Sequence, residues 1–256
     1  MSAVGKWGRW VCVAGALALV TGAAVGCSSD DDTAQTTLTV YAAASLKKTF
    51  TAIEAAYEKQ HPDVDVKLNF DGSSALVNQI KQGAQVDVLA TADEATMAKV
   101  TSEVNTPQIF ARNTLVIVTA RGNPKKIENL AGLANPGIRT VVCAVQVPCG
   151  AAAKQVERDA GVTITPASEE SSVTAVLTKV TSGEADAGLV YVTDAKSVPD
   201  KVSVVLDPAF AKVVNNYPIA TLKSSSHQQQ AQEFVQMVLG ESGQKILADA
   251  GFAAAK

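Results

Sequence analysis

The feature that most constrains the fold is a regular alternation of strand and helix patterns along residues 37–100. Apolar patterns predict strands at 37–42, 64–70 and 86–91, and amphipathic spacing predicts helices at 46–60, 74–82 and 94–100. This β-α-β-α-β order requires a parallel sheet with right-handed crossovers. In open sheets of this kind, ligands bind beyond the carboxyl ends of the strands.

Residues after 114 begin the same kind of pattern again, which predicts a second α/β unit. Its strands are expected at 115–118, 139–144, 187–192 and 202–206, and its helices at 150–160 and 172–182. A last strand at 218–222 and helices at 227–239 and 241–249 have no partner unit, so we expect them to return to the first.

These patterns predict an α/β protein with two lobes, each a mostly parallel sheet flanked by helices. Lobe 1 is expected to comprise residues 37–114 plus 219–256, and lobe 2 residues 115–218. The chain would cross between the lobes twice, near 113–118 and near 213–222, and the two crossings would form a hinge.

The first 27 residues have the organisation of an export signal. Lys6 and Arg9 precede an apolar, glycine-rich run that is too short for a comfortable membrane span. The stretch Ala-Val-Gly-Cys at 24–27 is typical of a bacterial lipobox, in which the cysteine is lipidated. We predict a signal peptide at 1–26, a lipidated Cys27 that anchors the protein to the outer face of the cell membrane, and a tether at 27–36. An ordinary secretory signal cut nearby is the alternative.

The charge balance argues against a nucleic-acid partner. The chain has 22 lysines and arginines against 25 acidic residues, and removal of residues 1–26 takes away Lys6 and Arg9, which leaves a net charge near −5. Nucleic-acid binding requires clustered basic side chains. We expect a monomer whose contact with the membrane is made through the lipid anchor.

The cysteines predict one disulfide bond. Cys12 is lost with the signal and Cys27 is assigned to the anchor, so Cys143 and Cys149 remain. Two cysteines in an exported protein favour a bond between them, and the small loop that it closes would contribute about 2 kcal/mol to stability. A metal site is not expected, because the two histidines of the chain are far apart in polar segments.

Four strand-to-helix junctions carry hydroxyl groups or bare backbone where a helix begins. They lie at residues 43–45, 72–74, 148–150 and 170–173. A helix N-terminus offers unpaired N–H groups and the positive end of the helix dipole, which together bind anions. A serine there is also a common N-cap, so a single junction would indicate only capping. Several such junctions at one edge of two facing lobes predict an anion site, where Gly72 and Gly150 would let the anion approach the backbone.

A serine acyl enzyme is the alternative from another functional class. Ser45 and Lys48 fit the S-x-x-K spacing of penicillin-recognising enzymes. The S-D-N and K-T-G elements that those enzymes also need do not occur in the sequence, and no histidine pairs with a nucleophile as a general base. We therefore do not expect an enzyme, and we expect Lys48 to face water.

Six segments, in order, resemble the molybdate-binding proteins of ABC importers, which have the type II periplasmic-binding-protein fold. They are TVYAAASL, FDGSSALVNQI, DVLATAD, NPKKI, VPCG and GLVYVTDA, and the resemblance spans residues 37 to 253. It implies that an oxyanion is held between the lobes by two serine hydroxyls, two main-chain amides and a tyrosine hydroxyl. These positions fall on Ser45, Ser73, Cys149, Val173 and Tyr191. For Tyr191, a packed core position is the alternative.

The resemblance also implies a ligand and partners. The ligand would be molybdate or tungstate, bound as an oxyanion without a cofactor or a side chain that ligates the metal, and it would pass to a permease and an ATPase. Sulfate or another tetrahedral oxyanion is the alternative, because the sequence does not give the cleft size. A site made of donors would reject phosphate, whose proton needs an acceptor at neutral pH. Glu169 and Glu170 are expected to lie outside this site.

Overall fold

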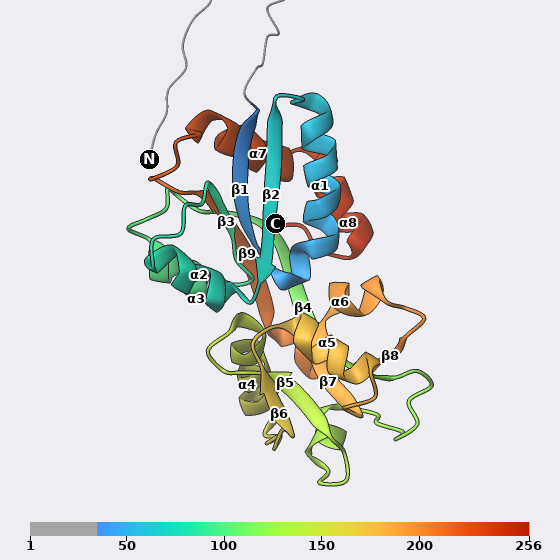
Figure 1. The fold of residues 1–256 in the computed structure, drawn as a ribbon. Helices are drawn as coiled ribbons and strands as arrows, with labels where there is room; N and C mark the ends of the chain where they lie inside the picture. Colours follow the sequence, from blue (N-terminus) through green and yellow to red (C-terminus); the bar gives the residue numbers. More distant parts are fainter. Residues whose placement is uncertain (1–34, 256) are drawn as a thin grey trace, which may run out of the picture. The chain divides into compact units, whose positions relative to one another are not determined.

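Strands and helices alternate along residues 35–255, the part of the chain that the computed structural model describes (Figure 1). The predicted signal peptide, Cys27 and the tether up to residue 34 lie outside the described residues. The strands are β1 (Thr36–Ala43), β2 (Val64–Asp71), β3 (Val88–Ala90), β4 (Gln108–Ala120), β5 (Thr140–Cys143), β6 (Ser168–Glu170), β7 (Ala187–Tyr191), β8 (Val202–Val205) and β9 (Val214–Thr221). The helices are α1 (Lys47–Gln60), α2 (Ser73–Lys81), α3 (Glu94–Met97), α4 (Pro148–Ala160), α5 (Val173–Thr181), α6 (Val192–Ser197), α7 (Gln228–Leu239) and α8 (Glu241–Ala250).

The strands of the described residues are hydrogen-bonded in the order β2-β1-β3-β9-β4-β7-β5-β6, and β8 pairs with β4. β1 is parallel to β2 and β3, and β5 is parallel to β6 and β7. β4 and β9 run antiparallel to their neighbours. The sheet therefore contains two groups of three parallel strands, joined through two antiparallel strands.

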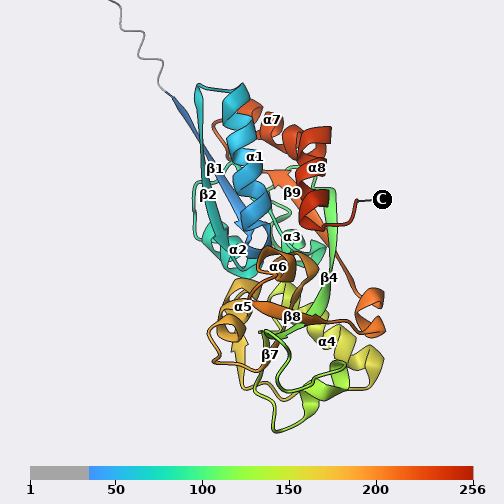
Figure 2. The same ribbon diagram turned by 90° about the vertical axis from the view of Figure 1, so that its right-hand side faces the viewer.

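β4 connects the two groups because it pairs with different strands along its length (Figure 2). Its first half, as far as Thr114, pairs with β9, and its second half, from Leu115, pairs with β7 and β8. The sequence pattern predicts a strand only at 115–118, where four apolar residues follow one another. Residues 108–114 mix polar and apolar side chains, and pairing with β9 fixes their extended form.

Two short elements, β6 and α6, are not predicted by the sequence pattern. β6 is Ser-Glu-Glu and contains no apolar residue; it forms by parallel pairing with β5. The strand predicted at 187–192 ends at Tyr191, because α6 begins at Val192 and the side chain of Asp194 accepts a hydrogen bond from the Tyr191 amide. Within residues 35–255, no helix has the length and apolar character needed to cross a bilayer.

Aromatic side chains link the elements of the larger buried cluster. The ring centroids of Phe50 on α1 and Phe110 on β4 are 5.8 Å apart, and that of Phe110 is 6.2 Å from that of Tyr217 on β9. Tyr217 in turn contacts Tyr191 at the end of β7, at 5.8 Å. Tilted and edge-on aromatic pairs of this kind add about 0.5–1.5 kcal/mol per pair beyond area burial. The aromatic chain therefore leads from α1 to the carboxyl end of β7.

The disulfide bond between Cys143 and Cys149 is confirmed. It joins the end of β5 to the first turn of α4 and so fixes the loop between them. Gly150 follows directly, and a Cβ atom there would lie 2.0 Å from the carbonyl oxygen of Ala144. A close backbone contact within this loop thus requires glycine at position 150, and the approach of an anion there stays a prediction.

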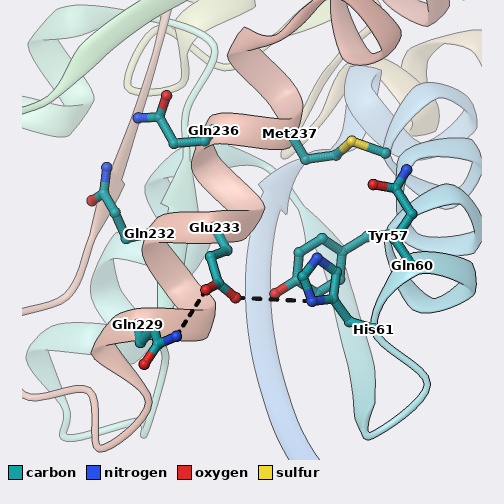
Figure 3. Close-up of a pocket in the computed structure, with 8 residues that line it drawn as sticks. All are labelled: Tyr57, Gln60, His61, Gln229, Gln232, Glu233, Gln236 and Met237. Carbon is teal, nitrogen blue, oxygen red and sulfur yellow. Dashed lines mark hydrogen bonds and ion pairs between the residues drawn. The ribbon is translucent and has the colours of Figure 1, made fainter.

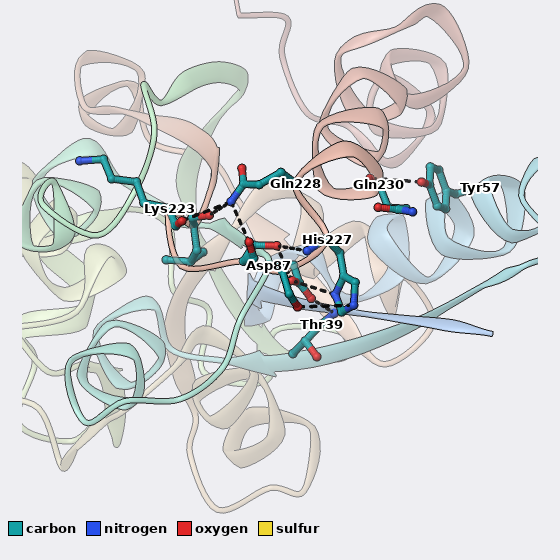
Figure 4. A network of polar contacts seen from close by, with 10 residues as sticks. Thr39, Tyr57, Asp87, Lys223, His227, Gln228 and Gln230 are labelled. Carbon is teal, nitrogen blue, oxygen red and sulfur yellow. Dashed lines mark hydrogen bonds and ion pairs between the residues drawn. The ribbon is translucent and has the colours of Figure 1, made fainter. Parts of the chain in front are cut away.

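A polar network joins β1, β3 and the start of α7 (Figure 4). Asp87, which is 7% exposed, accepts hydrogen bonds from the Thr39 amide at 2.7 Å and from the Ser225 hydroxyl at 2.5 Å. His227 Nδ1 lies 3.4 Å from the Asp87 carboxylate, and its Nε2 lies 3.5 Å from the Ser226 hydroxyl. The order is that of a Ser-His-Asp triad, but Ser226 is exposed and Asp87 is engaged by the backbone and by Ser225. The network fixes the loop before α7.

Candidate anion-binding site

A small, narrow cavity lies at the carboxyl ends of the parallel strands. It is lined by Ala43, Ala44, Ser45, Gly72, Ser73, Ala92, Val147, Pro148, Cys149, Ser172, Val173 and Tyr191. The structure therefore brings together all five residues for which the sequence analysis predicts contact with an oxyanion. The contact itself stays a prediction.

Each of the five residues lies where a strand passes into a helix. Ser45 belongs to the 3-10 turn that leads into α1, Ser73 is the first residue of α2, and Cys149 is the second residue of α4. Val173 is the first residue of α5, and Tyr191 ends β7. The amides of a first turn have no acceptor in their own helix, and the helix dipole is positive there. The helix starts thus direct donors and positive potential toward one small volume.

The Ser45 hydroxyl forms its hydrogen bond with Tyr217. Ser45 is 9% exposed, its Oγ lies 3.0 Å from the Tyr217 hydroxyl, and it caps no helix. Burial raises the pKa of Tyr217, so its hydroxyl stays protonated and is able to donate to Ser45. In that direction of the hydrogen bond, Ser45 keeps its own hydrogen for the cavity. Lys48 is exposed, as predicted.

The Ser73 hydroxyl is also free to donate. Ser73 is 1% exposed, and its Oγ accepts a hydrogen bond of 3.0 Å from the amide of Ala92. A serine oxygen that accepts from an amide still carries one hydrogen to donate. By contrast, Ser172 plays the capping role that a serine at a helix start commonly has, since its Oγ accepts from the amide of Ala175 at 3.3 Å.

Tyr191 combines a packed ring with a hydroxyl that has no partner. The residue is 1% exposed, and its hydroxyl forms no hydrogen bond within residues 35–255. Burial raises the pKa of Tyr191 well above its ordinary value, and the neighbouring Tyr217 raises it further. The group therefore remains a neutral donor. A buried donor without a partner is uncommon in folded proteins, and here it belongs to a residue that lines the cavity.

Close contacts between the starts of α2, α4 and α5 enclose the cavity. A Cβ atom on Gly72 would lie 2.1 Å from the carbonyl oxygen of Ser171, so only glycine permits this approach. The Ser74 hydroxyl donates to the carbonyl oxygen of Gln146 at 2.6 Å. Gly72 thus brings two backbone segments together at the cavity, and the approach of an anion to its backbone stays a prediction.

No charged side chain is among the cavity-lining residues of the described chain. Asp71, just outside, accepts from the Gly72 amide at 2.7 Å. Glu169 is exposed, and Glu170 forms an ion pair of 2.6 Å with Lys179. Burial alone would raise the pKa of Glu170, but hydrogen bonds from Lys179 and Ser168 lower it. As expected from the sequence, neither glutamate lines the cavity.

A groove between α1 and α7 is less suited to an anion (Figure 3). It is lined by Tyr57, Gln60, His61, Gln229, Gln232, Glu233, Gln236 and Met237. Glu233 brings a carboxylate into the groove, 3.9 Å from Nδ1 of His61. The His61 ring stacks on Tyr57 at 4.2 Å. These side chains are engaged with each other, so the donor-lined cavity remains the candidate site.

Two residues that support the cavity, Tyr217 and Asp194, are not among those predicted from the sequence. Tyr217 is 172 positions from Ser45, and only the placement of β9 within the sheet brings them together. Asp194 is 7% exposed and its Oδ2 accepts from the Tyr191 amide at 3.0 Å. An aspartate three residues after a strand end is a recognisable N-terminal helix signal, so the sequence did offer a clue to Asp194.

The fold and the cavity together define a protein with two α/β lobes that encloses a small solute. The chain belongs to the family of bacterial extracellular solute-binding proteins, whose model matches residues 38–253. It is 49% identical, over 219 residues and 84% of each chain, to the molybdate-binding protein ModA of Mycobacterium tuberculosis strain H37Rv.

Solved structures confirm the predicted two-lobe α/β fold. The periplasmic molybdate-binding protein of Azotobacter vinelandii matches with a TM-score of 0.75 and 24% identity, over 86% of this chain and 100% of that one. The sulfate-binding protein SubI of Mycobacterium tuberculosis H37Rv matches with a TM-score of 0.74 and 20% identity, over 86% of this chain and 88% of that one. At these identities the likeness establishes the fold.

Asp194 predicts a specific dependence of stability on pH. Burial raises the pKa of Asp194 from 3.8 to about 7, against the opposing hydrogen bond from the Tyr191 amide. Between these values the folded state holds a proton that the unfolded state has lost, so the Asp194 contribution to stability falls as pH rises from 3.8 to about 7. Asp194→Asn keeps the acceptor and removes the titration.

Urea unfolding of the wild type and of Asp194→Asn at pH 5 and pH 8 measures this effect. We expect the wild type to lose stability relative to the variant between the two pH values. If the free energies of unfolding of the wild type and of Asp194→Asn differed by the same amount at pH 5 and at pH 8, Asp194 would not titrate in this range.

Proposed function

We propose that this chain captures molybdate, and also tungstate, in the donor-lined cavity and delivers it to an ABC transporter. The observation that carries the proposal is a cavity lined by hydroxyl and amide donors and by no charged side chain of the described residues. The 49% identity to a protein named for molybdate binding supports the choice of anion. The transporter's permease and ATPase would be the partners, and binding would need no cofactor.

The ligand would be held through its oxygen atoms. The proposed donors are the hydroxyls of Ser45, Ser73 and Tyr191 and the amides of Cys149 and Val173. Hydrogen bonds to an ionised acceptor are about twice as strong as neutral ones, and a dry cavity strengthens them further. Cys149 contributes only its backbone, because its sulfur is bonded to Cys143.

The same donors give a physical basis for discrimination among oxyanions. Molybdate, tungstate and sulfate carry no proton at neutral pH, whereas phosphate carries one that needs an acceptor. No carboxylate or imidazole lines the cavity within the described chain, so that proton would be left unpaired, which costs about 1–3 kcal/mol. Sulfate is the alternative ligand, and only the size of the closed cavity would separate it from molybdate.

We also propose that the chain is not an enzyme. The Ser45 hydroxyl is hydrogen-bonded to Tyr217, a neutral phenol rather than a general base. Ser226 lies beside His227 but is exposed and outside the donor-lined cavity. A serine nucleophile needs a base, an oriented partner and oxyanion donors at one place. Absence of covalent labelling of Ser45 by a penicillin-type probe is the expected result.

We infer that ligand binding closes lobe 1 onto lobe 2. Lobe 1 comprises residues 37–114 plus 219–256, and lobe 2 comprises residues 115–218. β4 and β9 would be the hinge, because β9 pairs with β3 of the first group, β4 pairs with β7 of the second group, and β4 and β9 pair with each other. The contacts of Gly72 with Ser171 and of Ser74 with Gln146 would form on closure. Small-angle X-ray scattering should give a smaller radius of gyration with molybdate, and an unchanged radius would contradict the hinge.

Isothermal titration calorimetry with molybdate, tungstate, sulfate and phosphate tests the proposed function. We expect tight binding of molybdate and tungstate, weaker binding of sulfate and no binding of phosphate. If sulfate bound as tightly as molybdate, the assignment of the anion would be wrong. If phosphate bound as tightly as molybdate, the proposal that a cavity lined only by donors rejects a protonated anion would be wrong as well.

Removal of one hydroxyl should weaken binding by a measurable amount. Ser45→Ala and Ser73→Ala each leave one ligand oxygen without a charge-assisted hydrogen bond, so we expect a loss of about 1–3 kcal/mol in binding free energy. Ser182→Ala, at an exposed serine outside the cavity, is the matched control. Unchanged molybdate affinity in both cavity variants, measured by calorimetry, would refute the site.

We propose that the protein is exported and held as a monomer on the outer face of the cell membrane by a lipid on Cys27, after removal of residues 1–26. The segment 24–27 supports this, and residues 27–36 would be the tether. Metabolic labelling with a palmitate analogue should mark the wild type and not Cys27→Ser. Equal labelling of both would rule out the anchor and favour an ordinary secretory signal.

A further inference from the structure

A second groove adjoins the donor-lined cavity and is lined by three lysines and two aspartates. It is lined by residues from the starts of α1 and α5, from α6 and from the end of α8, and it shares Ala44 and Ser45 with the cavity. Thr174, the neighbour of the cavity-lining Val173, also lines the groove. The groove therefore adjoins the cavity at Ala44 and Ser45 and comes next to Val173.

Three lysines line this groove, Lys47, Lys48 and Lys196, and all three are exposed. None of them has an ion-pair partner within residues 35–255, although most of the ion pairs there involve a lysine. Unpaired cations grouped at one place create a local positive potential. They do so on a protein whose net charge is negative.

The two acidic side chains of the groove oppose these lysines only weakly. Asp249 forms an ion pair of 2.7 Å with Lys245, on its own helix. Asp194 is 7% exposed, accepts from the Tyr191 amide, and has a pKa raised to about 7 by burial. The groove thus presents more free positive than free negative charge, next to the site proposed for an anion.

We propose that this groove is the vestibule through which the oxyanion approaches the cavity, and that Lys47, Lys48 and Lys196 steer it there. The inference rests on the proposed function, because it assigns the path of the same ligand. The lysines do not line the cavity, so they act on the encounter and not on the bound anion. Steering by charges in a cleft raises association rates by about 10- to 1,000-fold and falls steeply with ionic strength.

The test compares two triple variants that have the same net charge. Lys47→Gln, Lys48→Gln and Lys196→Gln are combined in one, and Lys59→Gln, Lys81→Gln and Lys99→Gln in the other. The control lysines are exposed, have no ion-pair partner in the described chain and lie outside the groove. Lys59 is about 18 Å along α1 from Lys47, at 1.5 Å per residue.

Stopped-flow tyrosine fluorescence measures association with molybdate at several ionic strengths. The four tyrosines include Tyr191 and Tyr217, at and beside the cavity, and both tryptophans lie in the predicted signal peptide. At low salt we expect the vestibule variant to associate about tenfold more slowly than the control variant, with a weaker salt dependence. The dissociation rate should be unchanged.

Two results would overturn the vestibule. Equal association rates in the two triple variants would show that these lysines are only a solvated surface. A faster dissociation with an unchanged association rate would show that they contact the bound anion. Absence of molybdate binding by the wild type in calorimetry would instead refute the proposed function itself, so the two failures are distinguishable.

Discussion

The structure depends on one electrostatic constraint. Helix amides without an acceptor and hydroxyl groups surround a small cavity, and no charged side chain of residues 35–255 lines that cavity. The sheet topology produces this arrangement, because the carboxyl ends of two groups of parallel strands meet and each passes into a helix. Partial charges at several helix starts then replace one full positive charge. Such a site suits an anion that bears no proton, and it leaves a protonated anion unsatisfied.

The side chains behind the cavity hold its donors in position. Tyr217 orients the Ser45 hydroxyl, Asp194 holds the backbone at Tyr191, and the disulfide at Cys149 fixes the start of α4. Gly72 permits the approach of one backbone segment to another. None of these groups would have to touch the ligand. They reduce the reorganisation that binding requires, which is how a small cavity gains affinity from a few hydrogen bonds.

The sequence predicted local features well and long-range ones poorly. The helix starts at Ser73 and Val173 follow from apolar periodicity and small residues, and the disulfide follows from counting cysteines in an exported chain. The first half of β4 and the whole of β6 escaped prediction because strand pairing, rather than composition, determines them. Tyr217 escaped for the same reason. Gly72 and Gly150 also allow close backbone contacts, a role that has no signature in sequence.

The central claim is that one oxyanion is held by donors at the helix starts, and diffraction at the molybdenum absorption edge tests it most directly. Crystals grown with molybdate should give one strong anomalous peak inside the cavity. The oxygen atoms around this peak should lie within hydrogen-bond distance of five donors. These are the hydroxyls of Ser45, Ser73 and Tyr191 and the amides of Cys149 and Val173. A peak elsewhere, or one coordinated by carboxylate or imidazole groups, would contradict the account.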